Sequence, residues 1–138
     1  MNRALDLLRR PVGAALVDVV LVIVFAAVGR ASHDEGNPVI GALSTAWPFV
    51  VGTAVGWLVV RMLRGSWPLE VGPGITVWFA TLVIGMLLRR VTGEGTAASF
   101  VVVAAMVLAV FLIGWRAASA RWLRRRSDHP ASHGAPVP

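Results

Sequence analysis

The stretch GTAASFVVVAAMVLAVFLIGW, residues 95–115, contains no charged residue. It is close to the ~20 apolar residues that a helix needs to cross a bilayer. Two further uncharged stretches cover 36–60 and 71–88, and the stretch 11–29 carries a single charge, at Asp18. This pattern predicts an all-α fold, namely a polytopic membrane protein built as a four-transmembrane-helix bundle.

The predicted helices define one membrane domain, residues 11–118. We expect them at about 11–29, 39–62, 72–88 and 97–118. Residues 1–10 are predicted to form a cytoplasmic amphipathic N-terminus, with Leu5 and Leu8 towards lipid. Residues 119–138 are predicted to form a basic and then disordered cytoplasmic tail. The first apolar run resembles a signal peptide, but Asp18 interrupts it and no clean cleavage site follows, so we expect it to be retained.

The composition supports a membrane protein. The chain of 138 residues is 57% hydrophobic and 14% charged, against roughly 25% charged residues in soluble domains. Its net charge of +6 is the balance of 13 basic residues, all of them arginine, against 7 acidic ones. They flank the apolar stretches, which favours a bilayer with anionic headgroups over nucleic acid as the partner. Cysteine is absent, which excludes disulfides, thiolate nucleophiles and cysteine-ligated metal.

The arginines also indicate the orientation. Three lie at the N-terminus, two lie around the end of the second predicted helix and five lie at the C-terminal end from residue 116 onwards, whereas only Arg30, Arg89 and Arg90 lie on the other side. The positive-inside rule therefore predicts cytoplasmic N- and C-termini in a bacterial inner (plasma) membrane. Four tryptophans near the cytoplasmic ends are interpreted as interface anchors rather than ligand contacts. They are Trp57, Trp67, Trp115 and Trp122.

Asp18 is the residue with the highest expected free-energy cost of insertion into the membrane. An ionised carboxylate inside a membrane helix costs up to ~2.5–3.5 kcal/mol on insertion scales. It therefore has to face the bundle, and either pair or hold a proton. Arg116 is the best candidate partner by depth, and Arg61 is the second. Structural pairing is favoured over a proton or ion relay, and both interpretations stay open.

Arg30, His33 and Arg89 form a second candidate group, on the outer side. The simpler interpretation is that Asp34, Glu35 and Glu94 neutralise these arginines at the headgroup level. The alternative is an anion or lipid-phosphate site formed by Arg30 and Arg89, with His33 as a titrating neighbour. No metal site is expected at His33, because the adjacent residues Asp34 and Glu35 rarely converge with it on one ion. None is expected at His129 and His133, because the prolines of the tail disfavour the helix on which this spacing would bring them together.

Packing features occupy the second and third predicted helices. Pro48 is expected to kink the second helix and to open a small cavity beside Thr45 and Trp47. Gly52 and Gly56 form a small-xxx-small face that either packs within the chain or supports a homo-oligomer. Thr81 and Gly85 form a narrow face on the third helix that is suited to close packing.

The candidate polar cluster, functional or structural, gathers these positions. It comprises Asp18, Arg30, His33, Thr45, Trp47, Pro48, Thr81, Arg89, Trp115 and Arg116. No catalytic set, metal site or cofactor motif is recognised, so we expect a non-enzymatic scaffold or accessory subunit. The alternative is a small oligomeric transporter or channel subunit that uses Asp18 and the Arg30/His33/Arg89 group. A lipid-phosphate enzyme that uses His33 and Arg89 is less favoured.

The order of the motifs resembles a known family. The motifs are Asp18, Gly-Arg-x-Ser-His at 29–33, Thr-Ala-Trp-Pro-Phe at 45–49, Gly-x-x-Val-Trp at 74–78, Thr-x-x-x-Gly-Met-x-Leu-Arg at 81–89, Ser-Phe-Val-Val-Val-Ala at 99–104 and Leu-Ile-Gly-Trp-Arg at 112–116. Together they resemble the small prokaryotic membrane proteins grouped as domain of unknown function 3054, over about 15–118. The resemblance implies four membrane spans and no assigned activity.

Overall fold

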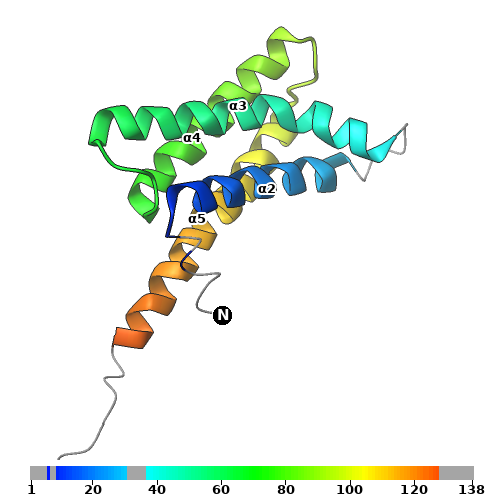
Figure 1. Cartoon of the computed structure of the whole chain (residues 1–138). Coiled ribbons are helices and arrows are strands. Elements are labelled where there is room, and N and C mark those ends of the chain that lie inside the picture. The colour runs from blue at the N-terminus through cyan, green and yellow to red at the C-terminus, as the bar shows by residue number, and fades with distance from the viewer. Residues whose placement is uncertain (1–5, 7–8, 31–36, 128–138) are drawn as a thin grey trace, which may run out of the picture.

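The computed structural model describes residue 6 and residues 9–30 and 37–127. Within these residues, four long helices follow one another and no strand occurs (Figure 1). They are α2 (Pro11–Arg30), α3 (Pro38–Arg64), α4 (Val71–Val91) and α5 (Ala98–Ser127). Each is long and apolar enough to cross a membrane. The predicted all-α, four-span architecture is therefore confirmed, and the protein is a multi-pass membrane protein.

The capping residues of α3 explain where this helix begins and where it ends. The Asn37 side chain accepts hydrogen bonds from the backbone N–H groups of Val39 and Ile40, and Pro38 occupies the first helical position. At the other end, Gly65 adopts a φ of 68° and donates its N–H to the carbonyl of Arg61. Asparagine and proline are favoured at helix starts, and glycine supplies the left-handed residue that ends a helix.

The four helices pack as two crossing pairs. In Figure 1, α2 and α3 lie side by side, and α4 and α5 run across them. α3 makes the most extensive contacts, chiefly with α4 and then with α2, and α5 packs against α4 and α2. α5 continues beyond the other helices at its C-terminal end. This arrangement brings residues of α2, α3 and α5 together in the interior.

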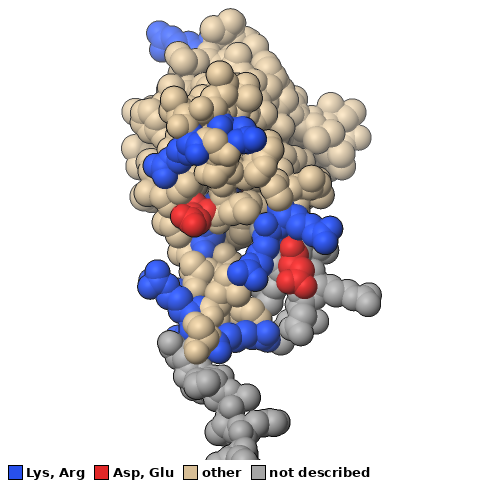
Figure 2. All heavy atoms as spheres, turned by 60° about the vertical axis from the view of Figure 1, so that its left-hand side comes forward, with Lys and Arg blue, Asp and Glu red and all other residues tan. Residues whose placement is uncertain are grey.

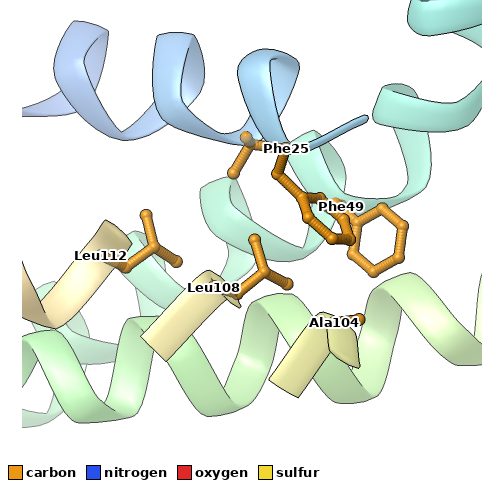
Figure 3. Close-up of a cluster of buried hydrophobic side chains, with 6 residues drawn as sticks. Phe25, Phe49, Ala104, Leu108 and Leu112 are labelled. Carbon is orange, nitrogen blue, oxygen red and sulfur yellow. The ribbon is translucent and has the colours of Figure 1, made fainter. Parts of the chain in front are cut away.

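The apolar core lies where α2, α3 and α5 meet. Figure 3 shows Phe25 and Phe49 pointing towards each other, with Leu108 of α5 near them and Leu112 one turn further along the same helix. The two rings pack edge to face, with centroids 5.3 Å apart and planes at 86°. Such edge-to-face pairs are worth ~0.5–1.5 kcal/mol beyond their area burial. A Cβ at Gly85 of α4 would overlap the Phe49 ring, so the narrow face predicted on the third helix makes room for this ring.

The outward face of α2 is as apolar as its inward face. Val12, Leu16, Val20, Val24 and Val28 recur every four residues and are between 40% and 72% exposed. Soluble proteins rarely present a continuous apolar stripe of this length to water. Against acyl chains the same stripe is favourable, because lipid is as apolar as the side chains themselves. The exposed surface therefore supports the membrane assignment independently of helix length.

α5 is longer than predicted. It continues to Ser127, whereas the sequence pattern predicts a helix end near 118, so the basic segment 119–127 extends the helix. The physical reason is that alanine and arginine are good helix formers once the chain has left the bilayer. Thirty residues span about 45 Å, beyond the ~30 Å hydrocarbon core. Leu5, Leu8, His129 and His133 lie outside the described residues.

Gly52 and Gly56 face α4 of the same chain. A Cβ at Gly52 would lie 2.9 Å from the Cα of Thr81, and one at Gly56 would lie 2.9 Å from the Cα of Val77. The two backbones therefore approach as closely as glycine allows, as in other small-residue helix contacts in membranes. Of the two alternatives for this face, the structure bears out packing within the chain. The predicted homo-oligomer through Gly52 and Gly56 is not tested by this contact and stays a prediction.

Candidate functional site

Asp18 lies on the inward face of α2. Its carboxyl group is fully buried, and Ala14 and Val22, one turn to either side, are buried with it. A carboxylate cut off from both water and headgroups needs partners for both oxygen atoms. Three side chains, one from α3 and two from α5, supply them.

Arg116 is the ionic partner of Asp18, as predicted. Its Nη1 donates to Oδ1 of Asp18 at 2.8 Å and its Nη2 donates to Oδ2 at 2.7 Å. Neither side chain is exposed to solvent. Two parallel charge-assisted bonds are the strongest arrangement of this pair. Two further Arg116 donors are used within the protein: Nε donates to the carbonyl of Pro68 at 2.9 Å, and Nη1 donates to that of Leu112 at 2.6 Å.

Two tryptophans complete the coordination of Asp18. The indole Nε1 of Trp57 donates to Oδ2 at 2.8 Å, and that of Trp115 donates to Oδ1 at 2.8 Å. Each carboxylate oxygen therefore accepts two hydrogen bonds, which equals the acceptor capacity of an ionised carboxylate. We call Asp18, Trp57, Trp115 and Arg116 the Asp18 cluster. It joins α2, α3 and α5 with the segment before α4.

Gly74 allows the guanidinium to reach the carboxylate. A Cβ at this position would lie 2.6 Å from Cδ of Arg116 and 3.0 Å from its Nε. The arginine side chain thus passes directly over the backbone of α4 in its first turn. The glycine is needed because any larger residue would displace a side chain that is already fixed by its hydrogen bonds.

Two threonines form a smaller polar contact between α3 and α4. The hydroxyl oxygens of Thr53 and Thr81 lie 3.0 Å apart, and both are buried. Each hydroxyl also lies within hydrogen-bond distance of a carbonyl of its own helix, that of Phe49 or Val77. Thr81, singled out from the sequence, therefore joins a helix contact and lies apart from the Asp18 cluster.

The outer arginines have separate neighbours. The guanidinium of Arg30 lies against the backbone of Gly41, where a Cβ would overlap it. Arg89 forms an ion pair with Glu94 at 2.5 Å and lies over the Phe100 ring, 4.7 Å from its centroid. Neutralisation of Arg89 by Glu94 is confirmed. His33 lies outside the described residues, so a joint anion site with Arg30 and Arg89 stays a hypothesis.

The residues around Pro48 do not form one polar site. α3 continues through Pro48, which is buried, whereas Trp47 is 40% exposed on the lipid side. Thr45 is half-buried, and the Ser44 hydroxyl donates to the carbonyl of Gly41. These residues point in different directions because consecutive positions on a helix lie about 100° apart.

Two sequence interpretations are corrected. Trp57 and Trp115 are not merely interface anchors, because both donate to Asp18. Arg61, the second candidate partner, instead bonds to the carbonyl of Gly65 and lies 5.2 Å from the ring centroid of Trp67. A signal for Trp57 was present, since the dipeptide Gly-Trp occurs at 56–57 and again at 114–115. Both indole N–H groups donate to the carboxylate of Asp18.

Removal of one indole donor is expected to weaken the bundle. Trp57→Phe keeps the ring bulk but leaves Oδ2 of Asp18 one donor short, and hydrogen bonds to charged groups contribute roughly 1.5–3 kcal/mol. Trp78→Phe is the matched control, because its indole donates to the neutral carbonyl of Ala105, worth roughly 0.5–1.5 kcal/mol. Unfolding in mixed detergent micelles measures both. Equal losses of stability in the two variants would mean that the hydrogen bond to Asp18 contributes no more than the one to the carbonyl of Ala105.

Among residues 6, 9–30 and 37–127, no three His, Asp or Glu side chains are grouped as metal ligands. The arrangement that does occur is an ion pair closed by two indoles. It fixes the mutual positions of helices and leaves the carboxylate no vacant acceptor site.

Comparison with known proteins gives the family. No curated protein and no solved structure matches the chain. Residues 15–119 match the family described as "Protein of unknown function (DUF3054)". That region begins in α2, ends in α5 and contains the whole Asp18 cluster. The chain therefore belongs to the DUF3054 family of proteins of unknown function.

Proposed function

We propose that this protein is a non-enzymatic scaffold or accessory subunit of the bacterial inner membrane. The supporting observation is the saturation of Asp18, whose two oxygens accept four hydrogen bonds while the side chain is fully buried. A cluster of this kind holds helices in one register. The Asp18 cluster therefore favours a rigid helix bundle within the bilayer, as a scaffold requires.

The same observation weighs against the transport alternative. A carboxylate that carries protons or ions has to exchange them with water, and such residues in transporters line a water-filled cavity. Here Arg116 and two indoles would first have to leave Asp18. The outer arginines add little support, because Arg89 is already paired with Glu94.

We propose an orientation with both termini in the cytoplasm. The start of α2, the end of α3, the start of α4 and the end of α5 share one side of the bundle. That side carries Arg61, Arg64 and the basic last turns of α5. The opposite side carries Arg30, Arg89 and Arg90. The excess of arginine favours the cytoplasmic side.

A flux measurement tests the proposal. Purified protein in proteoliposomes is expected to give no flux of protons, K⁺, chloride or phosphate above that of protein-free vesicles. An ionophore in the same vesicles provides the positive control. Flux that depends on the wild-type protein would overturn the scaffold proposal in favour of a transporter or channel subunit.

Thiol labelling gives a second measurement, which the absence of cysteine makes clean. Ala14→Cys and Val22→Cys place a thiol one turn to either side of Asp18, on the same buried face. Both are expected to resist a water-soluble thiol reagent in intact membranes, because the face is dry. Ser127→Cys, at the exposed end of α5, is the control and is expected to react. Reaction of the two buried cysteines at the control rate would mean that water reaches Asp18.

A further inference from the structure

A cavity opens on the arginine-rich side, next to the Asp18 cluster. Its volume is about 590 Å³, within the ~300–1,000 Å³ range typical of ligand sites. Its walls come from the segment before α2, the start of α4 and the last turns of α5. The lining residues are Arg9, Leu69, Glu70, Val71, Gly72, Trp115, Arg116, Ser119, Ala120, Leu123 and Arg124.

The charges in this cavity favour an anion. Arg116 is compensated by Asp18, which leaves Arg9 and Arg124 against Glu70 among the charged lining residues, a net charge of +1. Both arginines are exposed, and neither has an ion-pair partner within the described part of the chain. Paired guanidinium groups match the geometry of phosphate oxygens.

The depth of the cavity matches that of lipid headgroups. The uncharged part of α5 ends at Trp115, and Ser119, Leu123 and Arg124 lie on the turns beyond it. Arg124 is eight residues past Arg116, or about 12 Å along the axis at the usual helical rise. In Figure 2, arginine side chains gather at the lower end of the described surface, where α5 ends in Figure 1. A lining that combines apolar side chains with arginines suits an amphiphile.

The start of α4 adds to this environment. Glu70 makes no side-chain cap at this helix end, and the first N–H groups of a helix carry a partial positive charge. Nothing lies within 4 Å of the position that a Cβ at Gly72 would occupy. The cavity therefore has open space beside these N–H groups.

We propose that this cavity binds the phosphate of an anionic phospholipid, with Arg9 and Arg124 contacting the phosphate oxygens. The glycerol and the first acyl carbons lie along Leu69 and Val71. The bound lipid lies next to Trp115 and Arg116 and supports the Asp18 cluster from outside. This site does not depend on the scaffold proposal, because a transporter could hold the same lipid.

Retention of phosphatidylglycerol tests the proposal. The full-length protein is reconstituted in phosphatidylcholine with phosphatidylglycerol and extracted in mild detergent, and bound lipid is measured by native mass spectrometry and by titration. The wild-type protein is expected to retain phosphatidylglycerol. The double variant Arg9→Gln, Arg124→Gln is expected to bind it at least about tenfold more weakly, because two charge-assisted contacts are lost.

The matched control is Arg10→Gln, Arg125→Gln. These arginines are the immediate neighbours, are exposed and do not line the cavity, so the change in net charge is identical. They are expected to retain the lipid as the wild type does. Equal loss in the two double variants would overturn the proposal, because it would indicate general attraction of a basic surface for anionic lipid.

A steric variant and a free anion complete the experiment. Gly72→Leu fills the open side of the cavity without changing a charge, and is expected to reduce phosphatidylglycerol retention to the level of Arg9→Gln, Arg124→Gln. Undiminished retention in Gly72→Leu would contradict the assignment. Inorganic phosphate at matched concentration is expected not to bind measurably, because it lacks the apolar contacts. Binding of phosphate but not of phosphatidylglycerol would exclude a lipid ligand.

Discussion

Asp18→Asn is expected to lower the free energy of unfolding by ~3–5 kcal/mol, the usual cost of breaking a buried ion pair by removing one partner. The carboxylate accepts four hydrogen bonds from Arg116, Trp57 and Trp115. Asparagine has only one acceptor oxygen. Its NH₂ group would replace the other oxygen and face an indole N–H and a guanidinium N–H, which are donors as well. The charge of Arg116 would also remain buried without compensation. Unfolding of the purified protein in mixed detergent micelles measures the loss.

A double-mutant cycle separates the pair from its surroundings. Arg116→Met removes the guanidinium and leaves Asp18 charged, so it is also expected to be strongly destabilising. Asp18→Asn combined with Arg116→Met removes both charges, and its loss is expected to be smaller than the sum of the single losses by roughly 0.5–3 kcal/mol. Additive losses would show that the two side chains do not stabilise each other. A loss below about 1 kcal/mol in Asp18→Asn would mean that the ion pair does not hold the helices together.

Gly52→Ala is expected to destabilise the protein by roughly 1–3 kcal/mol, the usual cost of overpacking. The added Cβ would lie 2.9 Å from both Cα and O of Thr81. These are backbone atoms, which cannot rotate away as a side chain does. α3 and α4 would have to separate, and the contact between the Thr53 and Thr81 hydroxyls at 3.0 Å would lengthen. The same unfolding measurement reports the effect.

Gly114→Ala is the matched control. Gly114 also lies within a membrane helix, but nothing lies within 4 Å of the position of its Cβ. The same chemical change is therefore expected to be neutral or stabilising by up to ~1 kcal/mol, because alanine has the higher helix propensity. Similar effects at Gly52 and Gly114 would mean that α3 and α4 do not meet as closely as described.

The ion pair of Asp18 was predictable because only depth was needed to find it. Asp18 and Arg116 each lie a short distance inside the arginine-rich ends of their helices, so a long guanidinium side chain reaches the carboxylate. The remaining contacts of the Asp18 cluster were not predictable. Trp57 looked like an interface residue, and neither Pro68 nor Gly74 carries a sign in the sequence that Arg116 will lie against it.

The sequence by itself determined the four spans, their order and the segments that join them, because transfer into a bilayer depends on the local run of apolar residues. Only the tertiary structure decided how each helix is rotated about its axis. From residue 11 to residue 29, α2 is apolar on every side apart from Asp18, and an apolar residue has no preference between lipid and a neighbouring helix. Close packing at Gly52, Gly56 and Gly85 and the four hydrogen bonds to Asp18 select the inward faces. These interactions join residues up to 98 positions apart, beyond the reach of any local pattern.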